Sequence, residues 1–556
     1  MSTRAAPGSA NAIELLFERF LAVWQGFQAH SETRLRWIFF SGLVLVCGVT
    51  AFTGAVPTRI YGHDVFIMLD NGWRAISGQR PHVDFNSPWG PVMFLVTSLG
   101  LTLSHHSANG IGYGTAIVAL VIGTWSFWLG AKRLPAGPRL VASFFLTTLT
   151  AAPYALSSFP FQSSHAMLYN RYGYALLGLI LMESLLVADG DPNETMGGLS
   201  SGAALGLCLF LKASYFTMGS AIFAVVSLIR WRLAGRRLAG ALMGFCAVSF
   251  CMLAYLRFDL AAMLSDLRMA AGARSAAISV WAPYWYILNH AGVLLTMILF
   301  TLVAALQLGG RNRWLRNGWW LPLLGAFTFF ADIGLMTSNA ASEVFPTSGV
   351  FAILVLGAIA REQPAQAPGG AQPMRWYYAA VLCLGALLFV PQFFADAVGI
   401  SYGALKKARP SNPAEVVRFT SPNLRPLLLY DGGAPRSNGR VYTEYVNDGV
   451  ALLQHESRPD ESVLTIDLAN PFSYALERKP PRGGLIGPSY HYSIDDQHRP
   501  TDEAFFGDAA IVMVPKHPAS DDAIYIDFYK AYEPGLKQRY SLAAESGWWR
   551  MYRRKP

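Results

Sequence analysis

The sequence predicts an α-helical polytopic membrane protein with about eleven transmembrane helices and a C-terminal α/β domain outside the membrane. The chain of 556 residues is 53% hydrophobic and 14% charged, whereas soluble domains average about 25% charged residues. Residues 396–556 hold 20 basic and 20 acidic residues, and residues 1–395 hold 24 and 15, which is the whole net charge of +9. Because this excess lies in the membrane part, it indicates cytoplasmic loops and not a nucleic-acid partner.

Three parts follow from this pattern. Residues 1–36 form a cytoplasmic N-terminal segment, in which the amphipathic stretch 13–27 is expected on the inner membrane surface. Residues 37–395 form the transmembrane domain, with a first outer loop at 57–91, and residues 396–556 form a soluble domain of ordinary size. We find no cleavable signal peptide. The five cysteines all lie in apolar runs, so they indicate no disulfide framework.

The spans were assigned as segments of about 20 mostly apolar residues. They begin near Trp37, Gly110, Leu140, Tyr169, Gly197, Ala213, Leu238, Trp285, Trp319, Phe345 and Trp376. Segment 91–103 is ambiguous. If it does not cross fully, the basic loops at 132–139, 230–237, 311–316 and 361–375 all become cytoplasmic, as the positive-inside rule requires. This topology predicts a multi-pass membrane protein with a cytoplasmic N-terminus and an extracytoplasmic C-terminal domain, which would be periplasmic in a bacterial inner membrane.

The same count of spans gathers ionisable residues on the outer face. We expect them to lie close together in space, and they are Asp64, Asp84, Arg171, Lys212, Arg257, Arg274 and Glu343. Asp332 lies inside a span instead, where a carboxylate costs about 2.5–3.5 kcal/mol on insertion scales. It therefore needs a partner that the sequence does not identify.

The first outer loop contains the densest chemistry, in Tyr61–Pro91, YGHDVFIMLDNGWRAISGQRPHVDFNSPWGP. Apolar residues recur at helical spacing from Val65 to Ile76, which predicts a short helix along the membrane, with its apolar face in lipid or against other spans. Asp64 is expected to cap this helix and Gly78 to end it. A purely structural interpretation is available: Asp64 is a cap, Asp84 is a loop charge, and Asp70 pairs with Arg74.

The series H-D, G-Q-R-P-H-V-D-F and P-W-G-P in this loop resembles the first outer loop of the GT-C superfamily of integral-membrane glycosyltransferases. This superfamily includes protein mannosyltransferases, lipid A aminoarabinose transferases and oligosaccharyltransferases. The resemblance covers about thirty residues well and the rest of the chain loosely. Two departures stand out: Val65 follows Asp64 where many members have Glu, and Ser87–Pro91 lacks the lysine of the aminoarabinose transferases.

The resemblance implies that a sugar moves from a polyprenyl-phosphate donor to an extracytoplasmic acceptor, with Asp64 as the base in an inverting reaction. Burial raises the pKa of a carboxylate and so suits it to this role. Lys212, after GAALGLCLFL, matches a lysine that the superfamily associates with the lipid phosphate. A lysine at a membrane edge can also simply extend its ammonium toward water.

Further residues are candidates for binding the donor phosphate or the sugar, namely Arg80, Asp84, Tyr169, Arg171 and Glu343. Arginine binds phosphate in a bidentate manner, but interfacial Tyr and Arg are also ordinary membrane anchors. A divalent cation, Mg or Mn, is an open alternative with His63, Asp64 and Asp84 as ligands, since some superfamily members use acidic metal ligands. The spacing of these residues matches no specific metal motif.

The C-terminal region predicts a small α/β domain. VYTEYVNDGVALLQHE suggests a strand or turn and then a helix, ESVLTIDLANPFSYALERKPP suggests strand, loop and helix, and AAIVMVPK suggests a buried strand. SYHYSIDDQHRP is interpreted either as a lining of a sugar or acceptor site or as a solvated loop. By analogy with the superfamily, this domain is expected to cap the active site or guide the acceptor.

Two other functional classes, a transporter and a membrane-anchored sensor, are alternatives to a glycosyltransferase. A transporter or flippase of lipid-linked saccharides would favour charges within spans, broken helices and internal repeats, and we find no repeat. A membrane-anchored sensor would leave the ionisable first loop unexplained. The expected partners are therefore the bilayer, the lipid-linked donor and an acceptor that is a glycan, lipid or protein.

Overall fold

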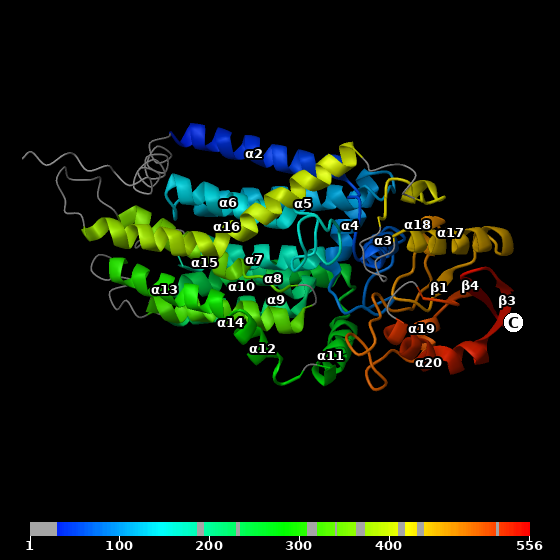
Figure 1. Cartoon of the computed structure of the whole chain (residues 1–556). Helices are drawn as coiled ribbons and strands as arrows, with labels where there is room; N and C mark the ends of the chain where they lie inside the picture. Colours follow the sequence, from blue (N-terminus) through cyan, green and yellow to red (C-terminus); the bar gives the residue numbers. More distant parts are fainter. Residues whose placement is uncertain are drawn as a thin grey trace, which may run out of the picture.

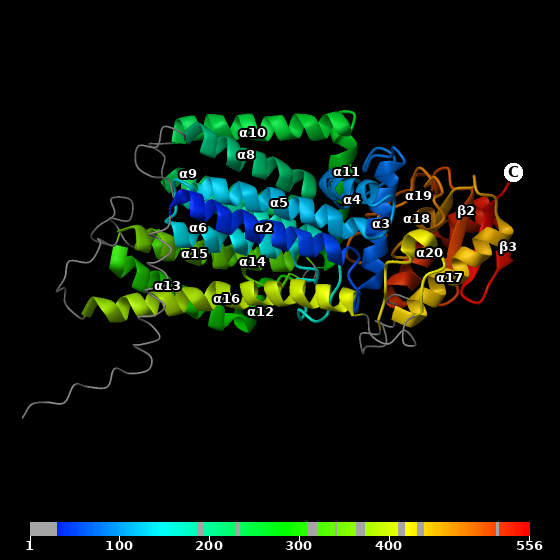
Figure 2. The ribbon, with the colours of Figure 1, turned by 90° about the horizontal axis from the view of Figure 1, so that it is seen from above.

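The computed structural model describes residues 31–185, 194–229, 234–277, 279–308, 320–339, 342–362, 373–409, 417–430, 439–518 and 522–556. A long helical bundle forms one end of the molecule and the C-terminal domain covers its other end, with α3 and α4 between them (Figures 1 and 2). The predicted amphipathic stretch 13–27 and the basic loop 311–316 lie outside the described residues.

Each of the eleven predicted spans is helical. They are α2 (Glu32–Thr53), α5 (Gly110–Gly130), α6 (Ala136–Ala151), α7 (Leu168–Leu185), α8 (Glu194–Leu211), α9 (Ala213–Ile229), α10 (Ala234–Tyr255), α13 (Ala291–Leu308), α14 (Trp320–Ser338), α15 (Pro346–Glu362) and α16 (Pro373–Ala408). Seven of the described helices are long and apolar enough to cross a membrane: α2, α5, α8, α10, α13, α14 and α16. Helix α16 continues to Ala408, past the predicted domain boundary at 396.

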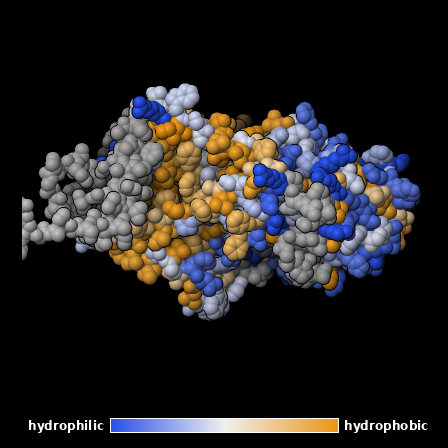
Figure 3. All heavy atoms as spheres, turned by 45° about the horizontal axis from the view of Figure 1, so that its top comes forward, coloured by the Kyte–Doolittle hydropathy of each residue, from blue (hydrophilic) through white to orange (hydrophobic). Residues whose placement is uncertain are grey.

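The outer surface of the bundle is apolar. Leu45, Phe250 and Leu306 are among its exposed large side chains. In the space-filling view, hydrophobic residues form a broad band over the bundle, and hydrophilic residues dominate the C-terminal domain (Figure 3). This is the pattern of a multi-pass membrane protein, because lipid solvates the band and water solvates the domain.

Helix α4 (Pro91–Leu103) is the ambiguous segment of the sequence. Its 13 residues extend about 20 Å, which is shorter than the roughly 30 Å of a bilayer core. It packs very closely on α5, because a Cβ on Gly100 would lie 1.9 Å from the carbonyl oxygen of Gly110. The short helix agrees with the prediction that this segment does not cross fully.

Helix α3 (Gly62–Ile76) is the predicted helix of the first outer loop, and it is buried from Val65 to Arg74. It packs against α4 and against α18 (Phe472–Ala475) of the C-terminal domain. The sequence left open whether its apolar face meets lipid or other spans, and the structure places protein on both sides. Gly78, at φ +81°, follows its end as predicted. The cap prediction was wrong: Tyr61 occupies the N-cap position, and no side chain makes a capping hydrogen bond there.

The C-terminal domain contains a four-stranded sheet in the order β1-β2-β4-β3. Strand β1 (Val463–Thr465) pairs in parallel with β2 (Ile511–Pro515), whereas β4 (Trp549–Arg554) is antiparallel to both β2 and β3 (Tyr540–Glu545). The helices around the sheet are α17 (Gly439–Glu456), α18, α19 (Asp502–Phe506) and α20 (Asp522–Arg539). The α/β class is as predicted, although the stretch from Val441, predicted as a strand or turn and then a helix, belongs entirely to α17.

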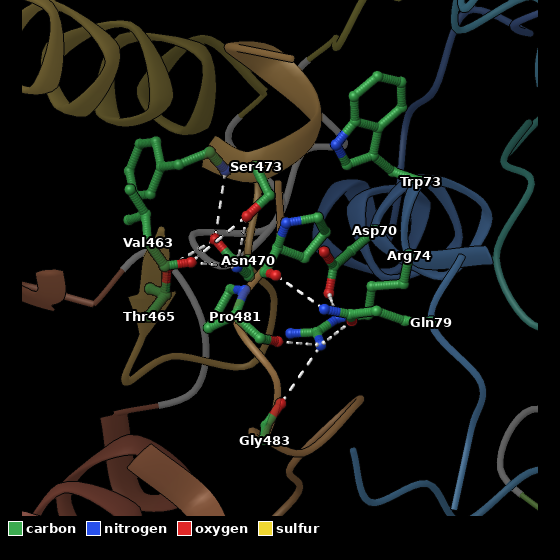
Figure 4. A network of polar contacts seen from close by, with 12 residues as sticks. Asp70, Trp73, Arg74, Gln79, Val463, Thr465, Asn470, Ser473, Pro481 and Gly483 are labelled. Atoms are coloured by element: carbon green, nitrogen blue, oxygen red, sulfur yellow. Dashed lines mark hydrogen bonds and ion pairs between the residues drawn. The ribbon is translucent and has the colours of Figure 1, made fainter. Parts of the chain in front are cut away.

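A buried polar network joins the domain to α3 (Figure 4). Asp70 Oδ2 accepts a hydrogen bond from Arg74 Nε at 3.1 Å, and Arg74 Nη1 donates to Gln79 Oε1 and to the carbonyl oxygens of Pro481 and Gly483. The predicted Asp70–Arg74 pair is therefore present. Because the arginine also satisfies carbonyls some 400 residues away, it fixes the C-terminal domain against the first outer loop.

Candidate functional site

Asp64 lies in the first turn of α3, at the end of the bundle that the C-terminal domain covers. Tyr61 precedes the helix with a left-handed backbone (φ 54°), a conformation uncommon for a residue with a side chain. One carboxylate oxygen of Asp64 is 3.3 Å from His63 Nε2, and the other is buried without a hydrogen-bond partner. Burial raises the pKa of Asp64, and the neighbouring His63 partly opposes the shift.

Lys212 stands in the break between α8 and α9, outside both helices. Its ammonium is 4.7 Å from the ring centroid of Tyr169. Among the described residues it forms no ion pair with a carboxylate. Burial, and secondly the charge of Arg274, lower the pKa of Lys212 to about 7. A half-buried cation beside another cation, with no ion pair to a carboxylate among the described residues, is suited to receive an anionic ligand.

Arg274 is the second cation of the site. It lies in the last turn of α11 (Leu260–Ala277), a helix within the stretch 257–283 that the sequence predicts as a large outer loop. Its Nη2 donates to the carbonyl oxygen of Thr337 at 2.8 Å. Its guanidinium carbon is 3.9 Å from the ring centroid of Tyr492, in the SYHYSIDDQHRP stretch of the C-terminal domain. Of the two interpretations of that stretch, this contact favours the one in which it lines a site.

Electrostatic contacts connect these residues into one group, which is called the ring of residues below. Its members are Tyr61, Asp64, Tyr169, Lys212, Arg274, Tyr286, Glu343 and Tyr492. Burial, then the charges of Asp64 and Glu343, raise the pKa of Tyr61. Burial and the charge of Glu343 also raise the pKa of Tyr286, and the charge of Arg274 partly opposes this increase.

Tyr169 completes the ring of residues. It lies within electrostatic range of Asp64 and of Tyr492, and its ring centroid is 5.3 Å from that of Trp89 in the SPWGP turn. Of the predicted outer cluster, Asp64, Lys212, Arg274 and Glu343 therefore lie within electrostatic range of common neighbours, and Tyr169 and Tyr492 join them.

Helix α11 is anchored at its middle by a residue that the sequence did not single out. Asp266 is buried, and its carboxylate lies 2.8 Å from His82 Nδ1. It also accepts hydrogen bonds from Asn86 Nδ2 at 2.6 Å and from the Ser87 N–H at 2.9 Å. Three bonds to the first outer loop hold the helix that carries Arg274.

Two sequence candidates are engaged elsewhere, which corrects their predicted place in the outer cluster. Arg171 is buried inside the bundle, where its Nη1 is 2.9 Å from Asp396 Oδ1 and its Nε donates to the Tyr154 carbonyl. Asp84 accepts a hydrogen bond from the Arg80 N–H at 2.8 Å and lies 3.7 Å from Arg482 Nε. Both side chains are held by neighbouring protein groups.

Two further charged residues also lie apart from the ring. Arg80 places its guanidinium 5.8 Å from the ring centroid of Tyr255 at the end of α10. Arg257 lies in an exposed turn directly after that helix. Arg257 belongs to the predicted cluster, which is therefore only partly assembled, and Arg80 is one of the phosphate-binding candidates.

Asp332 has a partner of an unexpected kind, the N-terminus of α15. Its carboxylate accepts hydrogen bonds from the Thr347 N–H, the Ser348 N–H and the Ser348 hydroxyl, at 3.3, 3.0 and 2.7 Å. A helix N-terminus stabilises an anion through its free N–H groups and its dipole. This explains how a carboxylate is accommodated in a span.

The residues proposed for a metal do not assemble. Within the described parts of the chain, no three His, Cys, Asp or Glu side chains form a group that could hold a metal ion. His63 and Asp64 are neighbours, but Asp84 is bound to Arg80. The set His63, Asp64 and Asp84 is therefore not a metal centre in this arrangement.

Comparison with known proteins identifies the fold. No family model matches the chain, and no curated protein matches it. ArnT from Cupriavidus metallidurans in the apo state aligns over 94% of this chain and 98% of its own, with a TM-score of 0.50 and 14% identity. The chain shares the fold of this ArnT.

Two further structures align over most of the chain with lower scores. The same ArnT bound to undecaprenyl phosphate gives a TM-score of 0.47 at 13% identity, over 94% of this chain and 98% of that one. The oligosaccharyltransferase AglB from Archaeoglobus fulgidus, in complex with an inhibitory peptide and a dolichol-phosphate, gives 0.34 at 12% identity, over 93% and 74%.

Proposed function

We propose that this GT-C chain is a glycosyltransferase that moves a sugar from a polyprenyl-phosphate donor to an acceptor outside the bacterial inner membrane. The observation that carries the proposal is the ring of residues around Tyr169. A buried carboxylate with one free oxygen, Asp64, and two cations without carboxylate partners among the described residues, Lys212 and Arg274, lie in the same ring. Base and phosphate-binding groups are the two requirements of this reaction.

The proposed chemistry is a single displacement. Asp64 takes the proton of the acceptor hydroxyl, and the freed oxygen attacks the anomeric carbon of the sugar. The bond between that carbon and the phosphate oxygen breaks, and its electron pair stays on the phosphate. Lys212 and Arg274 stabilise the charge that develops there. Because attack and departure occur on opposite faces, the configuration of the sugar inverts.

Other groups have supporting roles in this proposal. Tyr169 and Glu343 are positioned to contact the sugar, since both lie in the ring that contains the base and the cations. The C-terminal domain, through Tyr492, closes the site and keeps Arg274 in place. The acceptor is a glycan, lipid or protein that approaches from the side of this domain, which is periplasmic in the proposed topology.

Transport of lipid-linked saccharides is less well supported. A transporter would use charges within the spans. The buried charges Arg171, Asp396 and Asp332 in the spans are instead engaged with one another or with a helix N-terminus.

The test is sugar transfer in membranes that contain wild-type protein or the Asp64→Asn variant at matched levels of folded protein. The substitution keeps the size of the side chain and removes the base. We expect transfer to fall about 10²–10⁴-fold, the usual contribution of a general base. Asp84→Asn serves as the matched control and should retain activity. Unchanged transfer in Asp64→Asn would overturn the proposed role of Asp64.

A further inference from the structure

Helix α12 (Ala282–Asn289) connects the arm α11 to the span α13 and carries no charged residue, with the sequence APYWYILN. It packs on α14 at one side of the bundle, and along the long axis of the molecule α11 lies between it and the C-terminal domain (Figures 1 and 2). Only His290 separates it from α13. The sequence predicts one span from Trp285 onward, so the separate helix is a feature that only the structure reveals.

One face of α12 is an exposed aromatic stripe. Trp281, Tyr284, Trp285 and Leu288 are spaced by three and four residues, which puts them on one side of a helix. Their exposed fractions are 66, 52, 60 and 46%. The rings of Trp281 and Tyr284, and of Tyr284 and Trp285, are in edge contact at centroid distances of 6.4 and 5.9 Å. None of the residues that the structure describes covers this stripe.

The opposite face of α12 packs on the bundle next to the candidate site. Tyr286 and Ile287 contact the apolar cluster that contains Phe329 and Ile333 of α14. Tyr286 also lies within electrostatic range of Glu343 and Arg274. The helix is therefore a wall with the candidate site on one side and the aromatic stripe on the other.

The chemistry of the stripe identifies what covers it. Tryptophan and tyrosine concentrate at the boundary between lipid headgroups and acyl chains, where their polar N–H and O–H stay wet and their rings are buried. Helix α13, which follows α12 after His290, also exposes apolar side chains, among them Leu295, Leu299 and Leu302. Because α13 is long and apolar enough to cross a membrane, the bilayer is favoured over a second protein as the occupant of the stripe.

We propose that α12 lies in the outer-leaflet interface with its aromatic stripe in lipid, and that it thereby holds the candidate site at the depth of the lipid phosphates. This inference rests on the proposed function. In the proposed arrangement a lipid-linked donor passes α12 to reach Arg274, and the lipid tail of the donor remains in the bilayer. The helix acts as an interfacial anchor, and its residues take no part in the chemistry.

The position of the stripe is tested by fluorescence in lipid vesicles, comparing wild-type protein with the variant Trp281→Phe/Trp285→Phe. The emission lost in the variant belongs to these two residues. We expect that emission to be quenched by lipids brominated near the headgroup and not by aqueous acrylamide. Quenching by acrylamide alone would put the stripe in water, and quenching by neither would mean that protein covers it; either result overturns the proposal.

A transfer assay tests the consequence. The variant Trp281→Ser/Tyr284→Ser/Trp285→Ser should lose transfer from a long-chain polyprenyl-phosphate sugar in vesicles and keep transfer from a short-chain, water-soluble analogue. Trp128→Ser, which removes an exposed tryptophan from the opposite end of the bundle, should change neither. Equal loss with both donors would contradict the anchoring role. If wild-type protein uses neither donor, the proposed function fails, and the quenching result still decides where α12 lies.

Discussion

Charged side chains inside the bundle and at its outer end differ in whether they have an oppositely charged partner. Inside the bundle, Arg171 pairs with Asp396 at 2.9 Å, and Glu183 pairs with Arg237 at 2.8 Å. At the outer end, Asp64 has no lysine or arginine partner among the described residues, and its charged neighbour is His63 at 3.3 Å. Lys212 and Arg274 form no ion pair there among the described residues.

This difference separates structural charges from functional ones. Taking a charge out of water costs free energy unless a partner of opposite charge or several hydrogen bonds compensate it. Inside the bundle each of these charges has an oppositely charged partner, although one oxygen of Asp396 and one nitrogen of Arg171 still lack a hydrogen bond. At the outer end a ligand would supply the missing partners, through its phosphate and its hydroxyl. A charge without a lysine, arginine or carboxylate partner among the described residues is therefore the feature that distinguishes the site from its scaffold.

The largest expected effect comes from breaking a pair inside the bundle. Asp396→Ala leaves the Arg171 guanidinium buried without its carboxylate, which should destabilise the protein by about 3–5 kcal/mol. Thermal unfolding in detergent measures this loss. The double variant Arg171→Met/Asp396→Leu removes both charges and should recover most of the stability. A double variant as unstable as the single one would show that the pair is not the cause.

The second effect concerns ligand binding at the outer end. Lys212→Met should weaken binding of a polyprenyl phosphate by about 10²-fold, the scale of one lost contact to a developing oxyanion, with little change in stability. Lys407→Met is the matched control, because Lys407 is also at this end but donates to the Ala55 carbonyl and to Asn109. Equal losses for the two lysines would contradict a phosphate site at Lys212.

The pH dependence of transfer sharpens the comparison. Asp64 must be deprotonated to act as a base, so activity should fall as the pH drops through its raised pKa, above the ordinary value of 3.8. Lys212 must be protonated to bind phosphate, so activity should also fall as the pH rises through about 7.

Arg274→Gln tests the origin of the alkaline limb. It removes the like charge that depresses the pKa of Lys212, so that limb should move to higher pH. An unmoved limb would mean that Lys212 does not set it.

The smallest effect is expected at Asp84. An amide in Asp84→Asn can still accept the Arg80 N–H bond, and the contact with Arg482 is an exposed one of the kind worth about 0–1 kcal/mol. Transfer and stability should both stay close to wild type. A severe loss of transfer would show that Asp84 belongs to the site, contrary to the contacts it makes with Arg80 and Arg482.

Local patterns in the sequence predicted the helices, Asp64, Lys212, Tyr169 and Glu343, because apolar periodicity and short motifs are read within a few residues. What could not be predicted depends on long-range contacts. Arg171 binds a residue 225 positions away, and Asp266 binds His82 over 184 positions. The sequence predicted Arg274 only as one of several charges on the outer face. Its position near Lys212 and Tyr492 depends on how α11 packs.

The most direct test of this account is a crossed measurement on two carboxylates, Asp64→Asn and Asp396→Asn, with transfer per folded molecule and melting temperature recorded for both. We expect Asp64→Asn to lose transfer and keep or raise the melting temperature, because it removes a charge that, unlike Asp396, has no lysine or arginine partner. Asp396→Asn should lower the melting temperature and keep transfer per folded molecule. If both variants lose the same property, the separation of functional from structural charge is contradicted.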